Sequence, residues 1–151
     1  MKYLSIFFLF LFTLLLLPFQ ESLSQELPYD EGTVWSITFI RTKPGMSNEY
    51  FRHFAANLRG EYEEAKKQGL ILSYKLLFGN ATNKEDWNLL LMTEYKNMAA
   101  FDGVEEKWET ISAKLTGSQE QQKAGYTKRS EMRETFGTKI VREIIKKKKK
   151  L

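Results

Sequence analysis

The stretch Val34–Leu58, VWSITFIRTKPGMSNEYFRHFAANL, decides the fold because it predicts a strand, a turn and a helix in succession. Trp35, Ile37 and Phe39 occupy every second position of 34–40, and a period of two with β-branched and aromatic residues predicts a strand. Pro44-Gly45 breaks that strand, and Ser47 is placed to cap a following helix with its hydroxyl. The apolar residues of that helix keep a period of 3.6: Phe51, Phe54, Ala55, Leu58, Tyr62 and Ala65.

The rest of the chain repeats this alternation of strands and helices. The first helix is expected to run to about Gln68, where Gly69 stops it, and Asn97 is expected to cap a second helix that Gly117 closes. Because the loop between the second and third strands is short, these strands are expected to be antiparallel neighbours. The remaining segments are expected to be strands over 70–78, 87–95 and 136–145 and a polar, mostly exposed helix within 118–135, with a weak point at Gly125.

This order of elements resembles the dimeric α+β barrel superfamily. The turn 41–45 (RTKPG), the helix start 47–51 (SNEYF) and the junction 95–101 (YKNMAAF) carry the likeness, which covers about residues 33–145. The superfamily contains cofactor-free monooxygenases of the antibiotic-biosynthesis type, haem-degrading enzymes and stress-responsive barrel proteins. The resemblance implies an α+β, ferredoxin-like βαββαβ fold: a four-stranded antiparallel sheet with helices on one face, here with an extra polar helix before the last strand. It also implies a second subunit on the other face, with a ligand cavity on each subunit's side.

The N-terminal segment has the pattern of a secretory signal. Lys2 precedes an uncharged apolar run, 4–17, and the small residues Ser22 and Ser24 follow at the spacing that signal peptidase requires. The alternative, a membrane anchor, needs about 20 apolar residues. We therefore expect a periplasmic or secreted protein without a stable membrane anchor after cleavage. The expected organisation is a signal peptide (1–24), a flexible lead-in (25–32), one α+β barrel domain (33–145) and a basic tail (146–151).

The charge pattern disfavours nucleic acid as a partner. The formal net charge is +4, but the run Lys146–Lys150 supplies the excess and leaves the body of the chain nearly neutral. Nucleic-acid binding calls for a basic face on the folded domain, with interleaved aromatic residues. The chain also has no cysteine, which excludes disulfides and thiolate chemistry.

No cofactor or metal is expected from the residues available. His53, the single histidine, lies on the first predicted helix, whereas the resemblance to haem-degrading enzymes implies a histidine ligand on the second. We expect His53 to be a solvated or interfacial helix residue. One histidine and scattered carboxylates match no zinc spacing, and neither a nucleophilic triad nor a glycine-rich phosphate loop is present in the sequence.

Polar residues within the strands are the candidate ligand contacts. If the strands turn them to the face opposite the helices, Lys75 and Glu94 form a charge pair within an apolar wall, which suits a small apolar or aromatic molecule. Outward positions meeting water are the alternative. Cofactor-free oxygenases of the resembling superfamily use asparagine, tryptophan and tyrosine to hold substrate, which adds Trp35 and Trp87 to the aromatic candidates. The candidate ligand-binding residues are Ser36, Thr38, Ser73, Tyr74, Lys75, Asn88 and Glu94.

Two classes of function stay open. The first is a homodimeric small-molecule-binding or assembly module, and the second is a cofactor-free monooxygenase-like enzyme acting on an aromatic or polyketide-like substrate. No required acid, base or nucleophile emerges from the sequence, which favours the first class. The homodimer follows from the sheet, since helices cover one face while both faces carry large apolar residues. In the alternative, a monomer folds the segment 118–135 across the second face.

Overall fold

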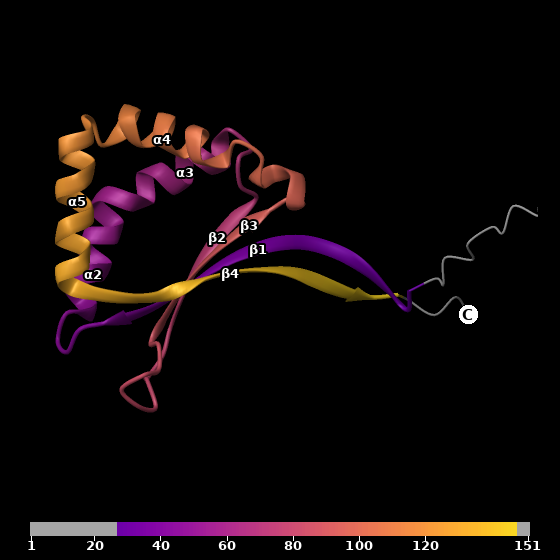
Figure 1. The fold of residues 1–151 in the computed structure, drawn as a ribbon, viewed down its shortest axis with the longest axis horizontal. Helices are drawn as coiled ribbons and strands as arrows, with labels where there is room; N and C mark the ends of the chain where they lie inside the picture. The colour runs from indigo at the N-terminus through magenta and orange to yellow at the C-terminus, as the bar shows by residue number, and fades with distance from the viewer. Residues whose placement is uncertain (1–26, 148–151) are drawn as a thin grey trace, which may run out of the picture.

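The computed structural model describes residues 27–147 and contains one four-stranded antiparallel sheet (Figure 1). The strand order across the sheet is β2-β3-β1-β4, so the first and third strands are central. Every neighbouring pair is antiparallel. This is the ferredoxin-like arrangement that the order of elements predicted. The strands are β1 (Tyr29–Thr42), β2 (Ser73–Phe78), β3 (Leu89–Tyr95) and β4 (Arg133–Lys146).

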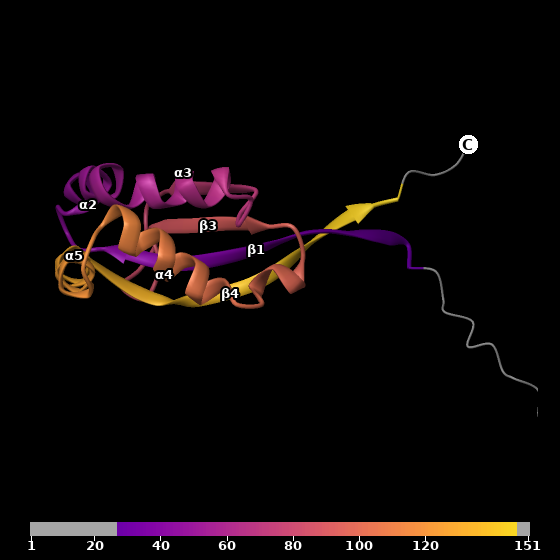
Figure 2. The same cartoon turned by 90° about the horizontal axis from the view of Figure 1, so that it is seen from above.

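The helices stand on one side of the sheet and leave its other face free (Figures 1 and 2). The first helical segment is contiguous from Ser47 to Lys67 but contains one π-helical turn. Gly69, with a φ of 71°, follows its end as predicted. The helical elements are α2 (Ser47–His53), the π turn η1 (Phe54–Leu58), α3 (Arg59–Lys67), the 3-10 turn η2 (Met98–Phe101), α4 (Val104–Leu115) and α5 (Gln119–Met132).

The pairing register tells which side chains share a face. Ile40 lies opposite Leu89, and Val34 lies opposite Tyr95; all four are buried beneath the helices. Because strand side chains alternate, the even-numbered residues of β1 from Val34 onward face the helices. The odd-numbered residues from Trp35 onward face away, toward the uncovered side, which we call the open face.

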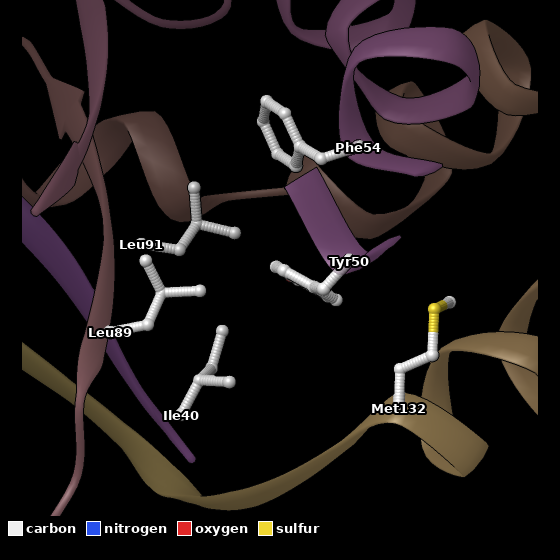
Figure 3. Close-up of a cluster of buried hydrophobic side chains, with 6 residues drawn as sticks. All are labelled: Ile40, Tyr50, Phe54, Leu89, Leu91 and Met132. Atoms are coloured by element: carbon white, nitrogen blue, oxygen red, sulfur yellow. The ribbon is translucent and has the colours of Figure 1, made fainter. Parts of the chain in front are cut away.

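The core lies between the sheet and the helices as two neighbouring clusters. Figure 3 shows the first, in which side chains from β1 and β3 meet Tyr50 and Phe54 of the first helix and Met132 at the end of α5. The second joins Ala65, Ile71, Tyr95 and Ile111. Tyr62 packs against both clusters, and its ring lies 5.1 Å from that of Trp108 and 5.0 Å from that of Tyr74. Burial raises the pKa of the Tyr62 hydroxyl, so it is neutral at physiological pH.

Strands β1 and β4 continue as a two-stranded ribbon beyond the rest of the sheet (Figures 1 and 2). The pairing with β3 begins at Val34, whereas the pairing with β4 begins at Tyr29. The register shifts between Glu31 and Val34, and a Cβ atom at Gly32 would lie 3.0 Å from side-chain atoms of Glu143 and Ile145. Glycine therefore permits the close approach of the two strands at this irregularity.

Several expected boundaries are wrong. Strand β1 begins at Tyr29, so strand replaces the second half of the flexible lead-in expected over 25–32, and β2 and β3 begin three and two residues later than expected. Ser47 does not cap the first helix: Met46 is the N-cap and makes no side-chain cap bond, while the Ser47 hydroxyl lies 2.7 Å from that of Thr42. Ile71 precedes β2 and packs on the helix side. The signal peptide expected over residues 1–24 and most of the expected basic tail lie outside the described residues.

Helix α5 is the extra polar helix that the sequence predicted, and it is continuous through Gly125. Ser118 caps it in a capping box with Gln121. Helix α5 packs against α2 and α4 on the helix side, so it does not cross the open face as the monomer alternative required (Figure 1). Within residues 27–147, no helix is both long enough and apolar enough to span a bilayer.

Candidate functional site

The open face of the sheet carries a broad apolar surface. Leu77 on β2 is 49% exposed and Val141 on β4 is 39% exposed, although both lie on strands. The central strands add half-buried aromatic and aliphatic side chains between them. The apolar residues that the register places on this face are Trp35, Ile37, Phe39, Leu77, Leu90, Met92 and Val141. Contiguous apolar surface of this kind marks an interaction site.

A small polar group lies at one end of the open face, and it includes three of the predicted ligand contacts. The Glu94 carboxylate accepts hydrogen bonds from Thr33 Oγ1 at 2.8 Å and from Ser73 Oγ at 2.5 Å. The Lys75 ammonium lies 4.9 Å from the centre of the Trp35 ring, a cation–π arrangement. Ser73, Lys75 and Glu94 therefore share a face as expected, but Glu94 is engaged by hydroxyl groups and Lys75 by an aromatic ring.

Three other predicted contacts lie on the helix side, where the open-face hypothesis did not place them. Ser36 lies opposite Thr93, and the Thr38 hydroxyl oxygen lies 3.0 Å from that of Thr138. The Tyr74 hydroxyl donates to Glu63 of α3 at 2.8 Å. The idea that all the strand polar residues share the face opposite the helices is therefore wrong. Ser36 and Thr38 alternate in phase with fully buried Val34, which lies on the covered face.

The Asn88 side chain links the start of β3 to the end of β1 through hydrogen bonds. Its Oδ1 accepts from the backbone N–H of Thr42 at 2.9 Å, and its Nδ2 donates to Thr42 Oγ1 at 2.7 Å. Both ends of the amide are thereby engaged by a single residue of β1. Trp87 packs edge-on against Phe39, with ring centroids 6.0 Å apart. These contacts assign Asn88 and Trp87 to holding the β1–β3 junction.

A second candidate site was not foreseen from the sequence. A pocket of about 430 Å³ lies where the first helical segment meets α4 and α5. Ligand pockets commonly have volumes of roughly 300–1,000 Å³. Polar and charged side chains from all three helical segments line it, among them His53, Asn57, Glu61, Ser112, Thr116, Gln121, Lys128 and Arg129.

The acidic side chain of this pocket has hydrogen-bond partners, whereas its two basic side chains form no ion pair among the described residues. Glu61, its only acidic lining residue, accepts hydrogen bonds from Ser112 Oγ at 2.9 Å and from Thr116 Oγ1 at 2.5 Å. Arg129 and Lys128 also line the pocket, and neither has a carboxylate within 4.0 Å in the described part of the chain. Burial, followed by the positive charge of neighbouring Arg133, lowers the pKa of Arg129. The lining therefore carries two cations against one carboxylate, which leaves a net positive charge in the pocket.

His53 lies on the wall of this pocket, immediately before the π turn. Its Nδ1 is buried and has no hydrogen-bond partner among residues 27–147. The backbone carbonyl of His53 accepts from Asn57 Nδ2 at 3.0 Å across the turn. Single π turns within helices occur frequently at functional sites. The sequence did single out His53, but its neighbours come from α5, whose position no local sequence signal predicted.

We expect the imidazole of His53 to titrate below its ordinary pKa of 6.5. Desolvation by burial lowers its pKa, and the charges of Arg129, Lys128 and Arg133 lower it further. Neutral His53 is thus favoured in the fold. This contribution to stability is fully present above pH 6.5 and is lost as the pH falls through the folded-state pKa. Because His53 is the single histidine, an NMR pH titration reports it without ambiguity; a midpoint at or above 6.5 contradicts the expectation.

The chain matches no family model and no curated protein. Among solved structures it is similar to a dimeric ferredoxin-like protein from an uncultured marine organism, with a TM-score of 0.45, 10% identity, and coverage of 79% of this chain and 91% of that one. It is also similar to a proposed antibiotic biosynthesis monooxygenase from Caulobacter crescentus, with a TM-score of 0.40, 16% identity, and coverage of 80% and 94%. The assignment of fold rests on this chain's own strand order and pairings: it is a ferredoxin-like α+β protein, as its resemblance to the dimeric α+β barrels predicted.

Proposed function

We propose that this protein is an exported homodimeric module, in which the open faces of two sheets pack together and enclose a space for a small apolar or aromatic molecule. One observation carries the proposal: the sheet has a broad apolar face that none of the helices of residues 27–147 covers (Figures 1 and 2). Export rests on the signal pattern in residues 1–24.

The energetics favour a second copy of the chain as the cover. Burying a fully exposed Leu or Phe side chain contributes about 1.5–3 kcal/mol, and the open face presents seven apolar side chains, each partly exposed. A two-fold axis lets the same face serve both partners, which is the commonest symmetry of soluble oligomers. Ser73, Lys75 and Glu94 lie on this face, so they would supply the polar contacts at one end of the enclosed space.

The monooxygenase-like alternative has less support. It called for Asn88 and a tryptophan to point together into a cavity large enough for a substrate. Trp35 does lie on the open face, and Trp87 packs edge-on against Phe39 of the same face, but Asn88 has both amide atoms engaged by Thr42. The engagement of Asn88 favours the binding and assembly function over the enzyme.

Sedimentation equilibrium of the purified protein tests the homodimer. We expect about twice the monomer mass at micromolar concentration. We also expect the mass to be insensitive to salt between low and physiological ionic strength, because the contact is apolar and screening acts on charges. A monomer mass under these conditions contradicts the proposal, and a mass that falls steeply with salt contradicts its apolar basis.

A further inference from the structure

We propose that the pocket between α2, α4 and α5 binds the anionic group of a small organic acid, a carboxylate or a phosphate ester, through Arg129 and Lys128. The pocket is on the helix side of the molecule, away from the open face. The inference therefore does not depend on the homodimer, and sedimentation does not test it.

The arrangement of charges carries the first step. Arg129 is half-buried on α5, and Lys128, the residue before it in the chain, lines the same pocket. Neither cation has a carboxylate within 4.0 Å among the described residues. A half-buried guanidinium that makes no direct ion pair is unusual, because a charge taken out of water needs pairing, and the charge of Glu61 in the same pocket offsets only part of that cost. An anion in the pocket would provide that pairing.

The state of Glu61 carries the second step. Glu61 is the one carboxylate of the lining, and its charge opposes part of the lowering of the Arg129 pKa, but among the described residues it makes no ion pair with the guanidinium, and its two oxygens accept hydrogen bonds from Ser112 and Thr116 of the α4 region. Its role is thus to join α3 to the end of α4 and to hold one wall of the pocket. The guanidinium keeps its donors available for a planar anionic group, which arginine recognises through two parallel hydrogen bonds.

The helices around the pocket bring the Arg129 guanidinium close to Gly125 and place on the facing wall a nitrogen of His53 that has no partner among the described residues. A Cβ atom at Gly125 would lie 3.5 Å from Nη1 of Arg129, so the guanidinium lies close to its own helix at the glycine. On the facing helix, the π turn at 54–58 follows His53, whose buried Nδ1 has no partner within residues 27–147. An unsatisfied buried polar atom beside a polar pocket commonly marks a site completed by a water, an ion or a ligand.

The volume and the neutral lining narrow the class of ligand. About 430 Å³ is more than a single inorganic anion fills, and the amides of Asn57, Gln121 and Gln122 line the pocket, each with one of its two polar atoms already hydrogen-bonded within the fold. Amides and hydroxyls both donate and accept, which suits hydroxyl or amide groups on the rest of the ligand. A polar organic acid fits these features better than an apolar one.

Isothermal titration calorimetry with sodium citrate and with sodium phosphate, each at constant ionic strength, tests the site. The Hε1 proton resonance of His53 reports where the probe binds. We expect saturable binding of at least one probe, with a shift of the His53 resonance. If only citrate binds, the ligand is a carboxylate, and if only phosphate binds, the ligand is a phosphate ester. Failure of both probes to bind, or binding that leaves the His53 resonance unmoved, overturns the proposal.

Three charge-removing variants separate the pocket from general electrostatics. Arg129→Gln is expected to weaken binding about tenfold or more, and Lys128→Gln about threefold or more, since each removes a charge-assisted donor. Lys123→Gln removes the same charge from the same helix, but Lys123 does not line the pocket. The affinity of this variant for the probe is therefore expected to stay within about twofold of that of the unmodified protein. Equal losses in all three variants, or an unchanged affinity in Arg129→Gln and Lys128→Gln, overturn the proposal. Lys128 is exposed, so that variant is expected to fold even if Arg129→Gln does not.

Discussion

Leu77→Glu is expected to convert the proposed homodimer into a monomer. Leu77 is 49% exposed on the open face, so the monomer tolerates a polar side chain there, whereas an apolar contact between two sheets does not. Association would bury the remaining half of each leucine, roughly 1 kcal/mol per copy. A carboxylate in its place adds a desolvation penalty of several kcal/mol per copy. Two copies together are expected to weaken the dimer by about 100-fold or more.

Leu115→Glu is the matched control for this experiment. Leu115 is 48% exposed, almost the same as Leu77, but it lies at the end of α4 on the helix side. We expect the Leu115 variant to keep the mass of the unmodified protein in sedimentation equilibrium. Far-UV circular dichroism should show both variants folded. If both variants, or neither, become monomeric, the dimer does not form through the open face.

Much of the fold was predictable because local patterns and tertiary structure agree. The strand at Val34–Ile40, the helix ending before Gly69 and the polar helix within 118–135 all follow from periodicity and composition. The second helix followed only in part, because Asn97 caps the short turn η2 and α4 begins separately at Val104, after Gly103. The extension of β1 back to Tyr29 did not follow, since Asp30, Glu31 and Gly32 are poor strand formers. Only pairing with β4, far away in sequence, makes that segment a strand.

Which row of β1 side chains faces the helices was harder to predict, and the prediction of the ligand contacts depended on it. One row of side chains contains Trp35, Ile37 and Phe39, and the other contains Val34 and Ile40, so both rows are apolar at their ends. Period-two alternation predicts two faces without telling which one the helices cover. The hypothesis that Ser36 and Thr38 share the face opposite the helices is therefore wrong. The pocket around Arg129 was beyond local reasoning altogether, because its walls come from segments that meet only in the folded chain.

Ile40→Ala is expected to lower the free energy of unfolding by about 2–5 kcal/mol, the usual cost of removing such a side chain from a close-packed core. Ile40 is fully buried where β1 meets β3, and its cluster joins the sheet to Tyr50, Phe54 and Met132 (Figure 3). Truncation leaves a cavity in the cluster that connects the first helical segment and the end of α5 to the sheet. Urea unfolding, followed by circular dichroism at a fixed protein concentration, measures the loss.

Ile140→Ala provides the comparison that separates core packing from strand propensity. Ile140 is also an isoleucine in a strand that pairs with β1, and it points to the helix side, but it is 50% exposed. Both substitutions remove the same atoms and the same β-branched residue, so a difference between them measures burial. We expect Ile140→Ala to lower the free energy of unfolding by about 1 kcal/mol or less. Equal losses in the two variants would mean that the cluster around Ile40 contributes no more than an exposed strand position, which is incompatible with the close packing of these side chains beneath the helices.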